Sequence, residues 1–177
     1  MATKNPRVVT GKARLSYAYL FKPQDKGDGK TPKYSVSIII PKTDKETIAN
    51  IQKAFEEAKA NSASYFGGTV PKLLKGGLRD GDAEKEDAAY ANSMFINANS
   101  VKKPNVVDAD MQPILDPDEV YSGCYGRVAI EFYPYNAEGS KGIACGLGNV
   151  QKLEDGEALG AGGVSADRTD LTWETRS

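Results

Sequence analysis

Apolar and polar residues alternate in several segments of this 177-residue chain, whereas helical spacing occurs in only one. Between positions 13 and 21 the odd positions are apolar or aromatic, and the intervening positions include Arg14 and Ser16. A period of two places these two groups on opposite faces of a strand. The pattern therefore predicts a long strand over residues 7–21. A loop should follow over residues 22–32, which are rich in glycine, proline and aspartate.

Two further strands are predicted before residue 100. Over residues 33–40 the alternating apolar face holds Tyr34, Val36, Ile38 and Ile40. Pro41 should end this strand, because proline has no N–H to donate to a ladder. A shorter strand is predicted over residues 94–98.

One helix is predicted, starting at a capping box formed by Thr43 as the N-cap and Glu46. It should run to about Asn61. Residues three or four positions apart would form its buried stripe: Ile48, Ile51, Phe55 and Ala58.

Alternating apolar residues predict another strand over residues 121–135. A five-residue turn over residues 136–140 should follow, and then a glycine-rich strand over residues 141–150. A turn centred near Glu138 would pair Tyr133 with Ile143 and Tyr135 with Lys141. In this register Val128, Ile130 and Phe132 would face Ala144, Gly146 and Gly148, and Cys145 would oppose Glu131. The other face would carry Arg127, Tyr133, Tyr135 and Lys141.

Several strands, one helix and no repeating βαβ unit indicate a mainly β protein. We expect an OB-fold-like, small antiparallel barrel with one helix across it and long loops, over residues 61–90 and 106–120 in particular.

Charge is strongly segregated along the chain, although 23 basic and 24 acidic residues sum to −1. Residues 1–79 carry a net charge of +9, residues 80–125 a net of −7, and residues 153–177 a net of −4. The basic part favours an anionic partner, and the acidic segments would repel that partner elsewhere.

The chain has no histidine, which excludes Ser-His and Cys-His catalysis and imidazole metal sites. Cys124 and Cys145 do not form a CxxC pair, so we expect no metal site and no cofactor. Reduced thiols are the favoured state, with a disulfide as the alternative. The chain has neither a run of apolar residues long enough to span a bilayer nor a secretory signal, so a cytoplasmic, non-membrane protein is expected.

Paired carboxylates were the remaining candidates for catalysis. They occur at Asp80/Asp82, Asp108/Asp110 and Asp116/Asp118. Each pair falls in a predicted loop without the ligand spacing of a calcium loop, which favours solvated turn acids. A carboxylate-metal nuclease is the weaker alternative.

Aromatic and basic residues interleave on the predicted strand faces. Single-stranded nucleic acid is held by this combination, since bases stack on rings while cations follow the phosphates. The alternative is that the tyrosines are half-buried core residues with solvated hydroxyls. The candidate binding residues are Lys12, Arg14, Tyr17, Tyr19, Lys33, Lys102, Lys103, Arg127, Tyr133, Tyr135 and Lys141.

Three stretches, ARLSYAYLFKP, PKYSVSIIIPK and the hairpin that begins YSGCYGRVAIEFYPYN, resemble the bacteriophage single-stranded-DNA-binding proteins formerly grouped as a domain of unknown function. The similarity spans about residues 7–163. It implies an OB-type barrel and sequence-independent binding of single-stranded DNA in phage replication and recombination. A non-catalytic phage structural or assembly protein is the alternative function.

The resemblance also implies an acidic C-terminal tail that recruits phage or host replication proteins. Here Arg168 and Arg176 interrupt the acids. We expect a binding domain over residues 1–163, a flexible polar tail over residues 164–177, single-stranded DNA as the partner in the host cytoplasm, and a possible homo-oligomer.

Overall fold

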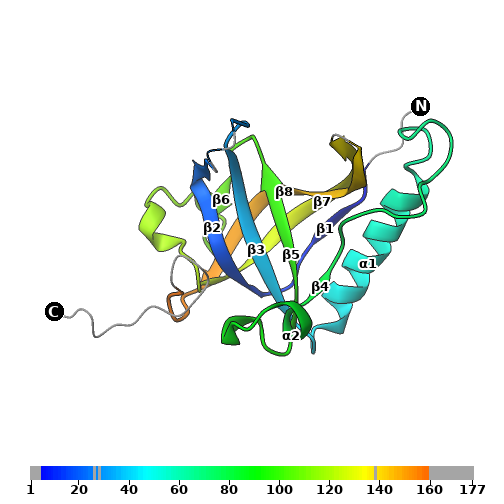
Figure 1. Ribbon diagram of the computed structural model, residues 1–177. Coiled ribbons are helices and arrows are strands. Elements are labelled where there is room, and N and C mark those ends of the chain that lie inside the picture. The colour runs from blue at the N-terminus through cyan, green and yellow to red at the C-terminus, as the bar shows by residue number, and fades with distance from the viewer. Residues whose placement is uncertain (1–4, 26, 28, 138, 160–177) are drawn as a thin grey trace.

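The computed structural model describes residues 5–25, 27, 29–137 and 139–159. Within these ranges the chain forms a curved sheet with one long helix, α1, against its side (Figure 1). The expected tail over residues 164–177 lies outside the described residues. None of the helices in the described ranges has both the length and the apolar character that crossing a membrane requires.

Five long strands form a closed ring, because β7 pairs with both β8 and β2. In ring order they are β2 (Ala13–Gln24), β3 (Lys33–Pro41), β5 (Ser93–Ser100), β8 (Ser140–Glu154) and β7 (Tyr125–Ala137). Short strands extend this ring: β1 (Arg7–Val9) pairs with β7, β4 (Arg79–Asp80) with β5, and β6 (Val106–Val107) with β8.

This ring confirms the predicted small barrel, with one difference in strand direction. The β5–β8 and β6–β8 pairings are parallel, whereas the prediction was wholly antiparallel. The β5–β8 contact consists of the single pair Asn99↔Gly146, so it is the narrowest seam of the ring. The barrel interior is apolar, and its fully buried side chains include Leu15, Ile38, Val128, Ile130 and Phe132.

The first predicted strand is broken in two at Thr10 and Gly11. The Thr10 hydroxyl accepts a hydrogen bond from Val128 N, and Gly11 N donates to the Thr47 hydroxyl of the helix. A Cβ at Gly11 would lie 2.8 Å from Asp44 Oδ2, so only glycine fits here without a shift. The strand β2 then continues to Gln24, into the predicted loop.

Helix α1 (Lys45–Ala60) is capped by Asp44, so the assignment of Thr43 as N-cap is wrong. Asp44 Oδ1 accepts a hydrogen bond from Thr47 N at 3.1 Å. A turn closed by the hydrogen bond from Asp44 N to Pro41 O precedes the helix, so the helix starts after Asp44. The predicted stripe packs on the barrel, and Phe55 meets Phe132 edge-on with 6.2 Å between ring centroids.

The segment after Arg79 is more ordered than the predicted loop. It contains α2 (Gly81–Glu84) and the 3-10 turn η1 (Ala88–Tyr90), and a second 3-10 turn, η2 (Pro117–Glu119), lies in the later loop. Tyr90 is buried beside Ile39 and Phe95 on the outer side of the sheet, which fixes this segment over β3 and β5.

The β7–β8 hairpin has a register one residue away from the predicted one. Ala137 pairs with Ser140, which leaves a two-residue turn in which Gly139 has φ +88°. Glycine adopts this conformation without strain, and the tighter turn shifts every pair. Tyr133 therefore pairs with Ala144 and Tyr135 with Gly142.

This shift exchanges the predicted faces of β8. Phe132 therefore pairs with Cys145 and Ile130 with Leu147, whereas the prediction paired Glu131 with Cys145. A bulge between Val128 and Ile130 then brings Val150 to the apolar face. Both cysteines are free and buried, as expected for reduced thiols. Burial raises the pKa of the Cys145 thiol to about 12.

The backbone of Lys75 anchors the segment before β4 to the hairpin, and Gly76 allows the close approach. Lys75 N donates to Lys141 O at 3.1 Å, and Ile143 N donates to Lys75 O at 2.9 Å. Gly76 follows with φ +115°, and a Cβ there would collide with the Ile143 carbonyl oxygen.

We predict that Gly76→Ala lowers the free energy of unfolding by more than ~2 kcal/mol, because it adds a backbone collision to the cost of a left-handed residue. Gly67→Ala is the matched control, since Gly67 also has positive φ but a Cβ there has no neighbour within 4 Å. It should cost only about 1 kcal/mol. Urea denaturation measures both values, and equal losses would contradict the role given to Gly76.

Candidate nucleic-acid interface

Two grooves lie on the outer surface of the barrel and share two of their lining residues. The first groove, of about 560 Å³, lies over β2, β3 and β5, and its lining includes Tyr17, Lys30, Lys33, Lys85 and Asn97. The second groove, of about 800 Å³, is bounded by β1, residues 99–105, β7 and β8. Lys33 and Asn99 line both grooves, so the two form one continuous surface.

The junction of the grooves coincides with the narrow seam of the barrel. Asn99 of β5 and Gly146 of β8 are the paired residues there, and Tyr133 lies beside Gly146. A Cβ at Gly146 would come within 3.0 Å of Tyr133 Cε1. The absence of a side chain at position 146 thus lets the tyrosine ring lie against the backbone of β8. Burial, followed by the nearby Cys145 and Glu131, raises the pKa of Tyr133.

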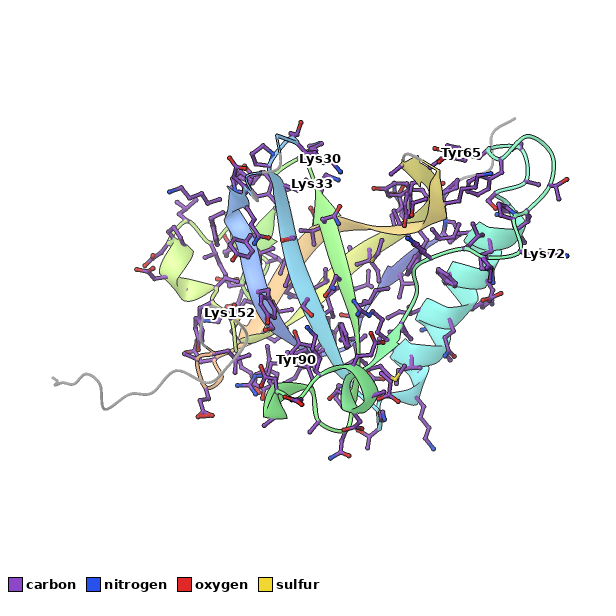
Figure 2. The ribbon with its side chains drawn as sticks, viewed as in Figure 1. Lys30, Lys33, Tyr65, Lys72, Tyr90 and Lys152 are labelled. Atoms are coloured by element: carbon purple, nitrogen blue, oxygen red, sulfur yellow. The ribbon has the colours of Figure 1, made fainter. Side chains whose placement is uncertain are left out.

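A cluster of rings closes one end of the first groove. Tyr17 sits at a bulge in β2 with φ 48° and packs against Ile39, Tyr90 and Phe95. Burial, followed by Tyr90, raises the pKa of Tyr17. Figure 2 shows Tyr90 near α2, where its hydroxyl donates to Ser37 Oγ at 3.0 Å.

Lys85 covers this ring cluster. Its ammonium lies 5.6 Å from the ring centroid of Tyr17, 5.3 Å from that of Tyr90 and 5.5 Å from that of Phe95. Such distances are those of cation–π contacts. The rings of Tyr90 and Phe95 are therefore covered, and the half-buried Tyr17 is the ring of this cluster with remaining exposure.

Three of the predicted lysines lie along the grooves. Lys33, Lys102 and Lys103 are exposed and line the second groove. The Lys103 ammonium lies 4.8 Å from the ring centroid of Phe21. Lys30 and Lys33 project from the same end of the barrel (Figure 2). Tyr133 and Tyr17 complete the set of predicted residues that the grooves bring together.

Lys12 and Arg14 lie elsewhere and have structural partners. Lys12 forms an ion pair with Glu154, and Arg14 donates to the carbonyl oxygens of Gly123 and Glu157 at 3.2 and 2.7 Å. Both cations also lie within 6 Å of the Tyr125 ring centroid, at 5.3 and 5.7 Å. These contacts hold the start of β2 against the far end of β7 and β8.

The remaining predicted residues line neither groove. Tyr19 pairs with Ser35 beside the first groove, and the exposed Arg127 pairs with Gln151. Tyr135 covers Gly142, where a Cβ would lie 2.7 Å from its hydroxyl oxygen. The expectation that Lys141 shares a face with Tyr135 is wrong, because Lys141 pairs with Asn136 and the one-residue shift reverses its side.

Sequence reasoning missed Lys85, Tyr90, Asn97 and Asn99. Tyr90 lies between alanines at positions 88, 89 and 91 and has no periodic context, so nothing local marked it as an anchor. The alternation within β5 was visible, since Asn97 and Asn99 occupy the face opposite Ile96 and Ala98.

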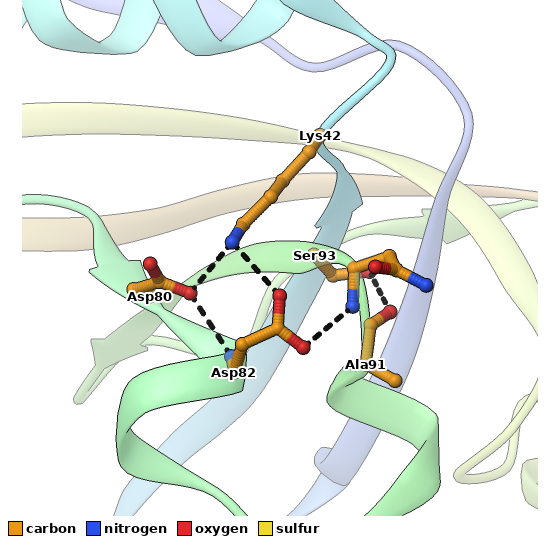
Figure 3. Close-up of polar contacts among 6 residues, drawn as sticks. Lys42, Asp80, Asp82, Ala91 and Ser93 are labelled. Carbon is orange, nitrogen blue, oxygen red and sulfur yellow. Dashed lines mark hydrogen bonds and ion pairs between the residues drawn. The ribbon is translucent and has the colours of Figure 1, made fainter.

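The first carboxylate pair forms an ion-pair network, shown in Figure 3. Lys42 Nζ lies 2.9 Å from Asp80 Oδ1 and 2.8 Å from Asp82 Oδ2, and Asp82 also accepts a hydrogen bond from Asn92 N. These bonds, that of Lys42 first, lower the pKa of both carboxyls. The network ties the end of β3 to α2.

The other two pairs also stabilise turns. Asp108 accepts backbone hydrogen bonds from Asp110 and Gln112, and Asp116 accepts one from Asp118. The interpretation as turn acids is confirmed for these two pairs, whereas Asp80 lies in β4 and Asp82 in α2 and not in the predicted loop. Over the described ranges, no cluster of three or more acidic or cysteine side chains is placed to hold a metal ion.

Comparisons with known proteins give one consistent relationship. The family described as "Enterobacter phage Enc34, ssDNA-binding protein" matches residues 6–176. The putative protein p50 of Acyrthosiphon pisum secondary endosymbiont phage 1 is 30% identical over 167 residues, which is 90% of each chain.

Among solved structures, the single-stranded DNA-binding protein of bacteriophage Enc34 in complex with ssDNA has a TM-score of 0.76 and 25% identity, covering 90% of this chain and 96% of that one. The single-stranded DNA-binding protein gp2.5 of bacteriophage T7 shares the fold, with a TM-score of 0.63, 18% identity, and coverage of 97% and 96%. The barrel fold and the match over nearly the whole chain agree, and this chain belongs to the family of the Enc34 single-stranded-DNA-binding protein.

Proposed function

We propose that this protein binds single-stranded DNA without sequence preference, in the continuous surface of the two grooves, and serves phage replication and recombination in the host cytoplasm. The observation that carries the proposal is the junction, where Lys33, Asn99 and Tyr133 line one path. Family membership supports the same function, since the Enc34 protein is described as binding ssDNA.

The residues of the grooves can bind both the base and the phosphate of a nucleotide. Tyr133 offers a ring for stacking, and Lys33, Lys102 and Lys103 offer cations for the phosphates. Backbone tracking by lysines and stacking on a tyrosine do not depend on the base, which accounts for the lack of sequence preference. OB-type barrels also bind oligonucleotides on their outer strand face.

We also propose that the protein is a binder and not an enzyme. Lys42 forms ion pairs with both the Asp80 and Asp82 carboxylates, and Asp108 and Asp116 accept backbone hydrogen bonds. Incubation of single-stranded DNA with the protein and either magnesium or manganese tests this, and cleavage that disappears in an Asp80→Asn/Asp82→Asn variant would overturn it.

The proposed function predicts that a fluorescent oligo-dT binds more tightly than duplex DNA of the same length at low salt. Anisotropy titrations measure both affinities. Equal or absent binding to both would instead favour a phage assembly protein.

We predict that Tyr133→Ala weakens binding of oligo-dT by about 5- to 160-fold, the range expected for loss of ~1–3 kcal/mol of stacking. Tyr133→Phe keeps the ring and should bind nearly as well as the unmodified protein. Tyr65→Ala is the control, because Tyr65 is 54% exposed and lines neither groove. A similar small effect for Tyr133→Ala and Tyr65→Ala would remove Tyr133 from the interface. Thermal melting verifies that the variants are folded.

Phosphate contacts are tested by the salt dependence of binding. Each lysine that neutralises a phosphate contributes about 0.7 to the slope of log affinity against log salt for single strands. Lys33→Ala and Lys102→Ala should therefore each reduce the slope by roughly that amount. Lys53→Ala, on the exposed side of α1, should leave it unchanged. Slopes that do not differ among the three variants would contradict the proposed path.

A further inference from the structure

Two loops at opposite ends of the molecule expose large apolar side chains. Leu73 is 89% exposed in the loop over residues 69–75, which we call the basic loop. Leu115 is 86% exposed and Met111 65% exposed in the loop over residues 108–119, which we call the acidic loop. Figure 1 shows the acidic loop beside β6 and the basic loop beyond the end of α1, with the barrel between them, and Figure 2 labels Lys72 at the latter end.

The two loops carry opposite charge. The acidic loop holds five acids, Asp108, Asp110, Asp116, Asp118 and Glu119, and no lysine or arginine occurs between positions 104 and 126. The basic loop holds Lys72 and Lys75 on either side of Leu73, and no acid occurs between positions 58 and 79. Over the described residues, no ion pair engages these five acids or these two lysines. Both charges are therefore available to a partner.

Each loop is held in place by the barrel. In the acidic loop, Asp108 N donates to Gln112 O at 2.8 Å and Ile114 N donates to Val106 O at 2.9 Å. The Gln151 side chain of β8 donates to Ala109 O at 3.2 Å. The basic loop is fixed through the Lys75 bonds to β8. A partner would meet preformed surfaces, which lowers the entropy cost of binding.

We propose that the acidic loop of one copy of this protein docks on the basic loop of the next copy. An apolar centre with surrounding charge of one sign complements a second apolar centre with charge of the other sign. Because the two surfaces differ, the contact is heterologous and propagates as an open chain of copies. Symmetric pairing is disfavoured, since it would place like charges opposite each other.

A head-to-tail chain of copies gives the proposed DNA-binding function a further property. Copies bound next to each other on one strand would contact through these loops, so binding to long DNA would be cooperative. A short oligonucleotide that accommodates a single copy would not report the contact. Cooperative binding to long DNA therefore measures the docking, and the affinity for a short oligonucleotide measures binding in the grooves.

The test uses charge reversal at each end of the full chain. One variant is Lys72→Glu/Lys75→Glu, which changes the net charge of the basic loop from +2 to −2. The other is Asp110→Lys/Asp118→Lys/Glu119→Lys, which changes that of the acidic loop from −5 to +1 and uses carboxylates that accept no hydrogen bond in the described structure. Each variant alone should lose roughly tenfold or more in cooperativity on poly-dT, because its ends repel. An equimolar mixture should regain it, since the reversed end of one variant complements that of the other. Lys53→Glu serves as the control.

The outcomes separate docking from DNA binding. Binding of one copy to a short oligo-dT should be unchanged in the charge-reversal variants. Full cooperativity in each variant alone, or no recovery in the mixture, would overturn the docking. A short-oligonucleotide affinity that falls for Lys72→Glu/Lys75→Glu without recovery in the mixture would assign the basic loop to DNA. If the unmodified protein binds no DNA, sedimentation at low salt still decides the docking, through association that each variant loses and the mixture restores.

Discussion

The closure of the barrel at the β5–β8 seam is the constraint on which the rest of the structure depends. β8 pairs with β7 along nearly its whole length but meets β5 only at Asn99↔Gly146. This single parallel contact brings the outer face of β3 and β5 next to that of β7 and β8. Asn99 of this pair lines both the first and the second groove.

Glycine at the seam links the geometry of the sheet to that of the interface. A side chain at Gly146 would occupy the place of the Tyr133 ring, and one at Gly142 would occupy that of Tyr135. Small residues on β8 therefore serve the outer, aromatic face of the hairpin. The sequence pattern suggested the reverse, with the glycines packed beneath Val128, Ile130 and Phe132. Those side chains instead meet Cys145, Leu147 and Val150, which fill the barrel more completely.

Strand positions and the helix could be predicted because alternation and helical spacing are local properties. The hairpin register was wrong by one residue because it depends on the backbone of a turn, and Gly139 permits a shorter turn than composition suggested. That single residue decides which side of β8 carries Lys141. Charge alone also failed to separate the groove lysines from Lys12 and Arg14. Their partners, the Glu154 carboxylate and the Glu157 carbonyl oxygen, are distant in sequence.

The near-zero net charge of the chain is a sum over groups with different physical roles. Asp80 and Asp82 share the single cation of Lys42, which compensates one of their two charges, whereas the acids of the acidic loop have no such partner. Electrostatic repulsion between exposed groups decays within about 10 Å at 0.1 M salt. The acidic loop lies on the opposite side of the barrel from Lys72 (Figures 1 and 2), so its charge acts mainly on what approaches that end. Segregation along the sequence thus becomes segregation in space between the acidic loop and the basic loop.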